Sequence, residues 1–504
     1  MQVATLIHNP GESTTTAIAE LTDDLGDLAI LITDQVEGSR SLETEIRRCG
    51  EAVPPWVRAE VSDGVARLLV RYSTVLDEID RWLRRASDRP DLELLAELRQ
   101  ARRRLTDEIR TLQAIAAGVA VAADWHSPSI NHSVHSTAGR FAGQVTPRHD
   151  DYKRDRHPDE WAWEQQWLQE MVDNPHRLPL RALMAASGMA AFTTILTHVM
   201  RRAPEGVFVV GESTYHESRQ LLHASGRSVI EIPEGDLAAW QRALALAPAA
   251  VFVDSLCNAA GMAVTDVAAL TRLLADSDAY LVVDNTGLSV GMQPWALRPP
   301  PGSRMIVFES LTKFAQLGLD RAAGGVIVTR ADEAEHLDEL REHLGTNIAD
   351  VVAHQHPVPR RSLLQRRLER VGRNARVVAE QLCRDSAGLS GAVRISHPSL
   401  GSHPGHRVLS DSGFFGGCIA IETTDRDPIA FSREFIEMAM HLAVARSIPI
   451  CEGTSFGLDT TRLYLTSSTT SHGTPFLRIA AGTEDRLGVD AVAAALGEAL
   501  VVTA

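Results

Sequence analysis

The first 120 residues carry the hydrophobic spacing of amphipathic helices. Between 65 and 82 the apolar side chains recur at intervals of three and four residues, on one stripe of a helix: Val65, Leu68, Tyr72, Val75, Ile79 and Trp82. A break at 87–90 is followed by the same spacing to about Ala117, as in a helical hairpin. We therefore predict a helical extension over residues 1–120. Packing or oligomerisation is favoured over ligand binding as its role, because such stripes usually bury against other helices.

Residues 121–160 are polar and lack this periodicity, which predicts an arm or loop. Four histidines in this stretch invite a metal hypothesis: His126, His132, His135 and His149. No HxxxH or HxH pair appears among them on a recognisable scaffold. The sequence therefore favours solvated or site-lining histidines, and we predict no metal site.

Short apolar runs alternate with helical stretches across residues 161–355. The runs are Val207–Val210, Val229–Ile232, Ala250–Val253, Tyr280–Val283, Met305–Phe308 and Val326–Val328. Such strands separated by helices predict an α/β domain with a parallel sheet covered on both faces. Ligands of such a sheet lie beyond the carboxyl ends of its strands. A long helix over Leu363–Leu382 leads into a smaller α+β domain, 356–504, which closes with a helix at Val489–Val501.

Charge and composition narrow the possible partners and the compartment. The net charge of −15 argues against nucleic acid and anionic membranes as partners. The longest apolar run, Ala114–Ala123, is about half of the roughly 20 residues that a membrane span needs, and no signal-like N-terminus is present. The five cysteines are odd in number and scattered, so we predict a soluble protein of the reducing cytoplasm without a disulfide framework.

Lysine is almost absent, which draws attention to the two that remain. Of the 50 basic side chains, only Lys153 and Lys313 are lysines and 48 are arginines. Arginine holds a positive charge but cannot act as a neutral amine. A chain biased against lysine should keep it where a deprotonatable amine is required, so Lys313 is a candidate for chemistry.

Three motifs of the α/β domain fall where its fold places a ligand. Ser187-Gly188-Met189 precedes a helical stretch, and a glycine there leaves backbone N–H groups open to a phosphate. Asp284 ends the apolar strand YLVV, where an acid can pair with a cationic ring nitrogen or form a turn. Lys313 follows the next strand in ESLTKF, with hydroxyls at Ser310 and Thr312.

Together these motifs match the order of groups in a pyridoxal 5′-phosphate site. The cofactor's aldehyde requires an amine, its pyridine nitrogen a carboxylate, and its phosphate N–H and hydroxyl donors. Arginine could not supply the first of these groups. We therefore predict Lys313 as the catalytic amine.

From about Tyr152 to the C-terminus, the chain resembles the Cys/Met-metabolism pyridoxal-phosphate enzymes, such as cystathionine γ-synthase, cystathionine γ-lyase and methionine γ-lyase. The matching segments are ASGMAA, STYHES, CNA, DNT, S-x-T-K, GG-V-V, NARVVAEQL and LRIAAGTED. The resemblance implies the fold type I architecture. It also implies a cofactor site of Ser187, Gly188, Met189, Tyr215, Asn258, Asp284, Thr286, Ser310, Thr312 and Lys313. Tyr215 would stack on the ring and take part in catalysis, and Arg478 and Ser455 would bind the substrate.

The resemblance also extends to DYKRDRHP, the family's segment that reaches a neighbouring subunit's phosphate. Tyr152 and Arg154 are implied as those cofactor contacts. The resemblance thus implies a homodimer or homotetramer with shared active sites. Glu309, Ala259 and Phe314–Asp320 depart from the family pattern. We interpret these departures as a rebuilt pocket edge around an intact cofactor site, which favours an unusual substrate and specialised metabolism.

The family chemistry leaves several outcomes open. The main expectation is γ-elimination or γ-replacement on activated homoserine or S-adenosylmethionine, with a possible second, nucleophilic substrate. The first alternative is a β- or γ-lyase acting on a sulfur amino acid such as cystathionine or methionine. The second alternative is a scaffold that binds the cofactor without catalysis, against which the retention of Lys313 argues.

Overall fold

A computed structural model describes residues 10–49, 55–88, 91–122, 158–297, 299–300, 302–389, 393–467 and 473–504. The chain divides into two compact units. The helical unit contains the first three helices together with Ala349–Val358 and Glu484–Val489. The larger unit contains Glu160–Ile348, Pro359–Thr483 and Asp490–Ala504. None of the described helices is long and apolar enough to cross a membrane.

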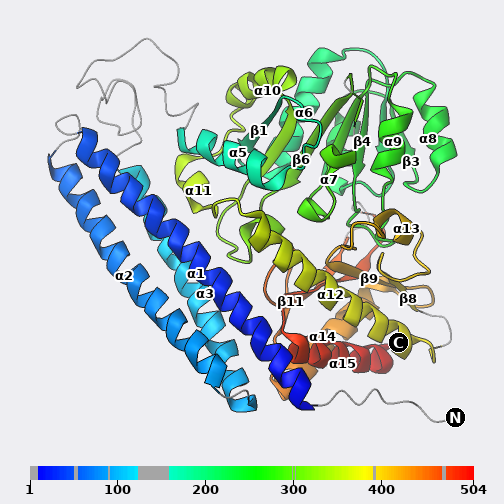
Figure 1. Cartoon of the computed structure of the whole chain (residues 1–504). Helices are drawn as coiled ribbons and strands as arrows, with labels where there is room; N and C mark the ends of the chain where they lie inside the picture. The colour runs from blue at the N-terminus through cyan, green and yellow to red at the C-terminus, as the bar shows by residue number, and fades with distance from the viewer. Residues whose placement is uncertain are drawn as a thin grey trace. The chain divides into compact units, whose positions relative to one another are not determined.

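Three long helices that pack side by side form most of the helical unit: α1 (Pro10–Cys49), α2 (Pro55–Asp88) and α3 (Leu92–Ala122) (Figure 1). The helical extension expected from the sequence is confirmed. The predicted hairpin corresponds to α2 and α3, and α1 adds a third helix. Its apolar positions repeat the spacing of three and four residues and are buried: Ile18, Leu21, Leu25, Leu28 and Ile32. The spacing of apolar residues that predicted the hairpin was therefore also present in α1.

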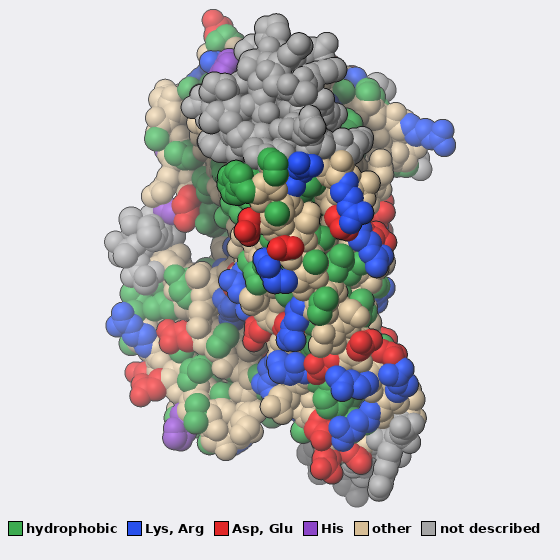
Figure 2. Space-filling view, turned by 90° about the vertical axis from the view of Figure 1, so that its left-hand side faces the viewer, with side chains coloured by type: hydrophobic (Ala, Val, Ile, Leu, Met, Phe, Trp, Pro, Cys, Tyr) green, Lys and Arg blue, Asp and Glu red, His purple; other side chains and the backbone are tan. Residues whose placement is uncertain are grey.

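Arginines of the helical unit form ion pairs between elements of that unit. Arg102 on α3 lies 2.9 Å from Asp24 on α1, and Arg99 forms a bidentate pair with Asp485 at 2.6 and 2.7 Å. Figure 2 shows side chains of both charge signs interspersed over one face of the molecule. Both pairs are largely buried, so these arginines serve as structural charge partners between the elements of the helical unit.

A seven-stranded sheet organises the larger unit. Its strands are β1 (Leu180–Ala185), β2 (Phe208–Gly211), β3 (Val229–Ile232), β4 (Ala250–Asp254), β5 (Tyr280–Asp284), β6 (Arg304–Ser310) and β7 (Gly325–Arg330), in the order β1-β7-β6-β5-β4-β2-β3. Only β7 runs against its neighbours, so the expected mostly parallel sheet is confirmed. The sequence did not predict β1, because LRALMA is rich in good helix formers and lacks β-branched residues.

Helices follow most of these strands and pack around the sheet (Figure 1). The helices are α5 (Pro158–Met171), α6 (Gly188–Arg202), α7 (His216–Ala224), α8 (Leu237–Leu244), α9 (Val267–Leu273) and α10 (Ala331–Leu344). Of these, α6 and α10 pack against β1 and β7. The core between helix and sheet contains Phe192, Phe252 and Phe308, whose rings meet at centroid distances of 5.9 Å. This packing fixes the start of α6 relative to the strand ends.

A second sheet belongs to the C-terminal part of the larger unit. Its strands are β8 (Val393–Ser396), β9 (Cys418–Thr423), β10 (Ile450–Glu452), β11 (Thr461–Thr466) and β12 (Phe476–Ala480), in the order β10-β11-β12-β9-β8. The remaining helices are α11 (Asp350–Gln355), α12 (Arg361–Ser386), α13 (His406–Leu409), α14 (Pro428–Arg446) and α15 (Arg486–Thr503). Both α12 and α14 contact this sheet. The expected smaller α+β part is thus present.

Candidate active site

A cavity of about 730 Å³ lies where β4, β5 and β6 of the large sheet end and is also lined by β11 and β12 of the smaller sheet. Twelve of the residues proposed from the sequence line this cavity: Ser187, Gly188, Met189, Tyr215, Asn258, Asp284, Thr286, Ser310, Thr312, Lys313, Ser455 and Arg478. The two others, Tyr152 and Arg154, lie outside the described residues. Parallel strands bring these dispersed residues together because their carboxyl ends share one edge of the sheet.

The turn between β1 and α6 presents backbone N–H groups and hydroxyls to the cavity. Ser187 is the N-cap of α6, and its side chain accepts a hydrogen bond from the Ala190 N–H at 3.0 Å. A Cβ atom added to Gly188 would lie only 2.8 Å from the Ser310 Cβ. Glycine thus allows this helix start to lie directly against Ser310, whose Oγ is 2.8 Å from the Thr312 Oγ1. This combination of a helix N-terminus with two hydroxyls suits a phosphate.

Two acids end adjacent strands beneath the cavity. Asp284 accepts a hydrogen bond from the Thr286 N–H at 2.9 Å, and Asp254 pairs with it in the β4–β5 register. Burial raises the pKa of both carboxyls, and the neighbouring charge of Asp284 raises the pKa of Asp254 further. The Oδ1 atom of Asp254 is buried without a hydrogen-bond partner among the described residues. The sequence analysis missed Asp254, although AVFVD ends in the same way as YLVVD.

The Lys313 amine lies in the cavity between the two sheets. Its Nζ donates to the Ser455 Oγ at 3.0 Å and lies 5.4 Å from the centre of the Phe456 ring. Burial, followed by the nearby charge of Arg478, lowers the pKa of Lys313. Both effects favour the neutral amine, which is the form that nucleophilic and proton-accepting chemistry requires.

The loop that carries Ser455 depends on an unusual backbone. Ser455 has a φ of +71°, in the left-handed region that side chains other than glycine rarely adopt. A Cβ atom on Gly457, whose φ is +82°, would lie 2.8 Å from the carbonyl carbon of Lys313 and the amide nitrogen of Phe314. Glycine at 457 therefore lets this loop touch the lysine's backbone, a contact that the sequence analysis did not identify.

Arg478 on β12 is placed to receive a carboxylate. Its side chain is buried, with Nη1 donating to the Asn258 Oδ1 at 3.1 Å and Nη2 donating to the Ser455 carbonyl oxygen at 3.2 Å. Its Nε is buried without a hydrogen-bond partner among the described residues. A buried guanidinium with an unsatisfied N–H fits an anionic group of the substrate.

Tyr215 lines the cavity, and buried carboxylates accept hydrogen bonds from the backbone N–H groups of its loop. Its N–H donates to the Asp254 Oδ2 at 3.0 Å, and the Ser213 N–H donates to the Glu234 Oε1 at 2.7 Å. Burial and then Glu217 raise the pKa of Tyr215 to about 12. The phenol is therefore protonated near neutral pH in this arrangement.

The expected rebuilding of the pocket edge at Glu309 and Phe314–Asp320 is wrong for the described cavity. None of these residues is among those that line it. Glu309 is buried within hydrogen-bond distance of the Asn285 Nδ2, at 3.3 Å, and Phe314 packs against Phe414 and Phe456. The alternation of side chains along β6 explains the error for Glu309, because successive residues of a strand point to opposite faces of the sheet. Ser310 faces the cavity, and Glu309 therefore faces away.

Burial raises the pKa of Glu309 to about 8, which gives a testable pH dependence. A carboxyl group whose pKa is raised by folding contributes stability below its unfolded value of about 4.5 and loses it as pH rises to 8. We expect Glu309→Gln to raise the free energy of unfolding of the holoenzyme by roughly 5 kcal/mol at pH 8.5 and to change it little at pH 5. Urea unfolding at both pH values measures this. Parallel pH profiles for the two proteins would contradict it.

Comparison with known proteins identifies the family. The Cys/Met metabolism PLP-dependent enzyme family matches residues 111–500. The chain belongs to this family and is a pyridoxal-phosphate-dependent enzyme. Bifunctional enzyme flvA of Aspergillus flavus is 27% identical over 350 residues, which is 66% of this chain and only 40% of that protein. Cystathionine gamma-synthase of Escherichia coli is 27% identical over 293 residues, 57% of this chain and 71% of that protein.

Solved structures share the fold. Cystathionine gamma synthase from Xanthomonas oryzae pv. oryzae, in complex with cystathionine, gives a TM-score of 0.59 at 22% identity and covers 72% of this chain and 91% of that one. A methionine gamma lyase from Micromonospora echinospora gives 0.55 at 24% identity, with 70% and 89% covered. The fold type I architecture expected from the sequence is thereby confirmed. The family match confirms the expected cofactor.

The described residues fit this cofactor. The close approach of Gly188 to Ser310 forms a cradle that a side chain would fill, Asp284 lies at a strand end, and Lys313 is a buried amine in the same cavity. When bound, pyridoxal phosphate supplies an electron sink for carbanions formed at the substrate amino acid. The protein must then supply proton transfer, orientation and a carboxylate contact.

Proposed function

We propose that this enzyme eliminates or replaces a γ-substituent of an amino acid, with activated homoserine or S-adenosylmethionine as the donor. The observation that carries the proposal is that Lys313 and Arg478 line the same cavity. The pKa of the Lys313 amine is lowered, and the Arg478 Nε has no hydrogen-bond partner among the described residues. The proposal assigns the phosphate to the Gly188 and Met189 amides with Ser310 and Thr312.

Lys313 would move the protons in this reaction. Arg478 holds the α-carboxylate while the Lys313 amine takes the Cα proton. Lys313 then removes a proton from Cβ. Departure of the γ-substituent with its bonding electrons completes elimination. Water and a proton then yield a keto acid and ammonia, or a nucleophile forms a new bond at Cγ. Tyr215 lines the cavity and would shield this chemistry from water by stacking on the bound cofactor.

A large, cationic donor suits the cavity. Its volume of about 730 Å³ holds more than a small amino acid beside the cofactor. Glu212 and Glu217 line the cavity and are exposed, so they offer negative charge to an entering ligand. Charge complementarity of this kind favours a sulfonium such as S-adenosylmethionine over a neutral O-acylhomoserine.

Deuterium incorporation tests the reaction class. In heavy water, the correct donor should lose its γ-substituent and gain deuterium at Cα and Cβ, both visible by mass spectrometry. Release of methylthioadenosine or of acetate identifies the donor. Keto acid and ammonia without an added nucleophile would indicate the γ-lyase alternative, and deuterium at Cα alone would contradict the proposal.

Replacement of Arg478 tests how the substrate is held. We expect Arg478→Ala to raise KM for the donor amino acid roughly 10- to 100-fold, because a charge-assisted bidentate contact is lost. A decarboxylated donor analogue serves as the control, since the variant should lose the wild-type preference for the carboxylate-bearing donor. Steady-state kinetics with both compounds measures this, and an unchanged preference would exclude Arg478 as the carboxylate contact.

We also propose an assembly and a setting for the enzyme. Tyr152 and Arg154, on an arm at 121–160, would reach the cofactor phosphate of a neighbouring subunit in a homodimer or homotetramer. The arm would separate a packing module at 1–120 from the cofactor domain at 161–355 and the smaller domain at 356–504. The described cysteines are free thiols, which supports a cytoplasmic enzyme. The unusual helical extension supports a role in specialised metabolism.

A further inference from the structure

The edge strand β1 leads into the phosphate-binding turn, and side chains complete its outer edge. Among the described residues, β1 pairs with β7 alone, and its other edge has no strand partner there. The Met184 N–H donates to the Glu164 Oε1 at 2.7 Å, and the Met184 carbonyl oxygen accepts from the Arg341 Nη1 at 2.6 Å. Two residues later, the Ala186 N–H donates to the Thr346 carbonyl oxygen at 2.8 Å. These contacts replace the missing strand.

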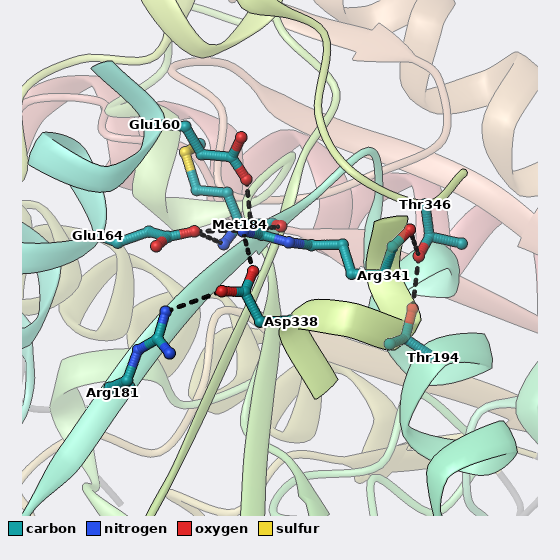
Figure 3. Close-up of polar contacts among 8 residues, drawn as sticks. All are labelled: Glu160, Glu164, Arg181, Met184, Thr194, Asp338, Arg341 and Thr346. Carbon is teal, nitrogen blue, oxygen red and sulfur yellow. Dashed lines mark hydrogen bonds and ion pairs between the residues drawn. The ribbon is translucent and has the colours of Figure 1, made fainter. Parts of the chain in front are cut away.

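Arg341 is the centre of a buried ionic cluster, which we call the Arg341 cluster: Arg341, Glu160, Glu164 and Asp338 (Figure 3). The Arg341 side chain is only 5% exposed and lies 2.7 Å from Glu164 and 2.6 Å from Asp338. Burial lowers the pKa of Arg341, but the surrounding carboxylates, Glu164 first among them, raise it by more, so the guanidinium stays charged. Such a cluster is expensive to desolvate, and apolar packing would stabilise the fold at least as well. Stability alone is therefore a poor reason for it.

Thr346, which follows α10, links the end of that helix to α6 through contacts that do not use the Arg341 side chain. The Thr346 N–H donates to the Arg341 carbonyl oxygen at 3.0 Å, and the Thr346 Oγ1 lies 2.6 Å from the Thr194 Oγ1 on α6 (Figure 3). On the inner side, a Cβ atom on Gly325 would lie 2.4 Å from the Ser187 carbonyl oxygen. The turn at Ser187 is thus held on one side by β7 and β6 and on the other by the Arg341 cluster and Thr346.

We propose that Arg341 is a positioning residue for the cofactor phosphate. Together with Glu164, its side chain holds Met184 near the end of β1, and this sets the direction of the Gly188 and Met189 N–H groups. This inference rests on the proposed assignment of those amides to the phosphate. It does not depend on which donor the enzyme accepts.

Comparison of two cofactor forms tests this role. We expect Arg341→Lys, which keeps the charge but loses the forked contacts, to raise the Kd for pyridoxal phosphate at least roughly 10-fold. The Kd for pyridoxal, which lacks the phosphate, should change less than about twofold, because its binding does not use the turn. Both are measured on apoenzyme prepared from the full chain, by absorbance on adding the cofactor. Glu164→Leu removes the acceptor of the Met184 N–H and should raise the same Kd ratio a few-fold, which tests the hold on Met184 if Arg341→Lys does not fold.

Glu333→Gln is the matched control. Glu333 pairs with His198 at 2.6 Å, so it joins the same two helices, α10 and α6, at their other ends. This variant should lower the melting temperature without changing the Kd ratio. Equal losses of affinity for both cofactor forms in Arg341→Lys and Glu164→Leu would overturn the proposal and leave the cluster a purely stabilising role. A wild-type protein that binds both forms equally would instead refute the phosphate assignment.

Discussion

Replacing Lys313 by alanine is expected to slow release of the γ-substituent by about 10⁴-fold, the full effect of losing a positioned proton-transfer group. Lys313 is the only lysine among the described residues, and its Nζ lies within the cavity, so no other described lysine amine can take over the proton transfer. The measurement is single-turnover release of the donor fragment by mass spectrometry. Added methylamine should restore part of the rate, since a small amine can enter the space that the side chain leaves.

Lys153→Arg provides the control, because it removes the chain's other lysine and keeps the charge. This variant should retain bound cofactor and turnover. Borohydride reduction followed by peptide mapping should find the cofactor attached at Lys313. Attachment at Lys153, or full activity of Lys313→Ala, would refute the central assignment.

The second large effect is expected for Asp284→Asn. A carboxylate at this strand end stabilises a protonated pyridine nitrogen, whereas an amide of the same shape does not. We expect exchange of the substrate Cα hydrogen for deuterium to slow roughly 10³-fold, with little change in substrate KM. The exchange rate, followed by mass spectrometry, measures carbanion formation directly.

Asp254→Asn is the matched control on the adjacent strand. The asparagine oxygen can still accept the hydrogen bond from the Tyr215 N–H, so the turn should keep its position. The pKa of Asp284 is raised by burial and lowered by Thr286 and Lys313, none of which this substitution changes. We therefore expect an exchange rate within about fivefold of the wild type. Similar losses in both variants would mean that the two acids act as one unit, and a normal rate in Asp284→Asn would make Asp284 a turn residue.

Local sequence patterns determined most strands of the large sheet and the site residues at their ends. Buried parallel strands are almost wholly apolar, so β2 to β6 stand out from the chain, and the acid at the end of β5 and the lysine after β6 follow from them. The near absence of lysine singled out Lys313 before any motif was considered. These features are readable because each depends on one element and its end.

Only the tertiary structure decided which side chains act together. The sequence could not show that Glu309 faces away from the cavity, because the facing of a strand residue depends on the sheet's partners. Nor could it show that Asp254 pairs with Asp284, or that Arg341 meets Met184 across 157 residues of sequence. The edge strand β1 was missed for the same reason: its composition favours a helix, and its pairing with β7 and the contacts of Arg341 and Glu164 make it a strand. Long-range pairing of this kind overrides local preference, and it is what places the turn at Ser187.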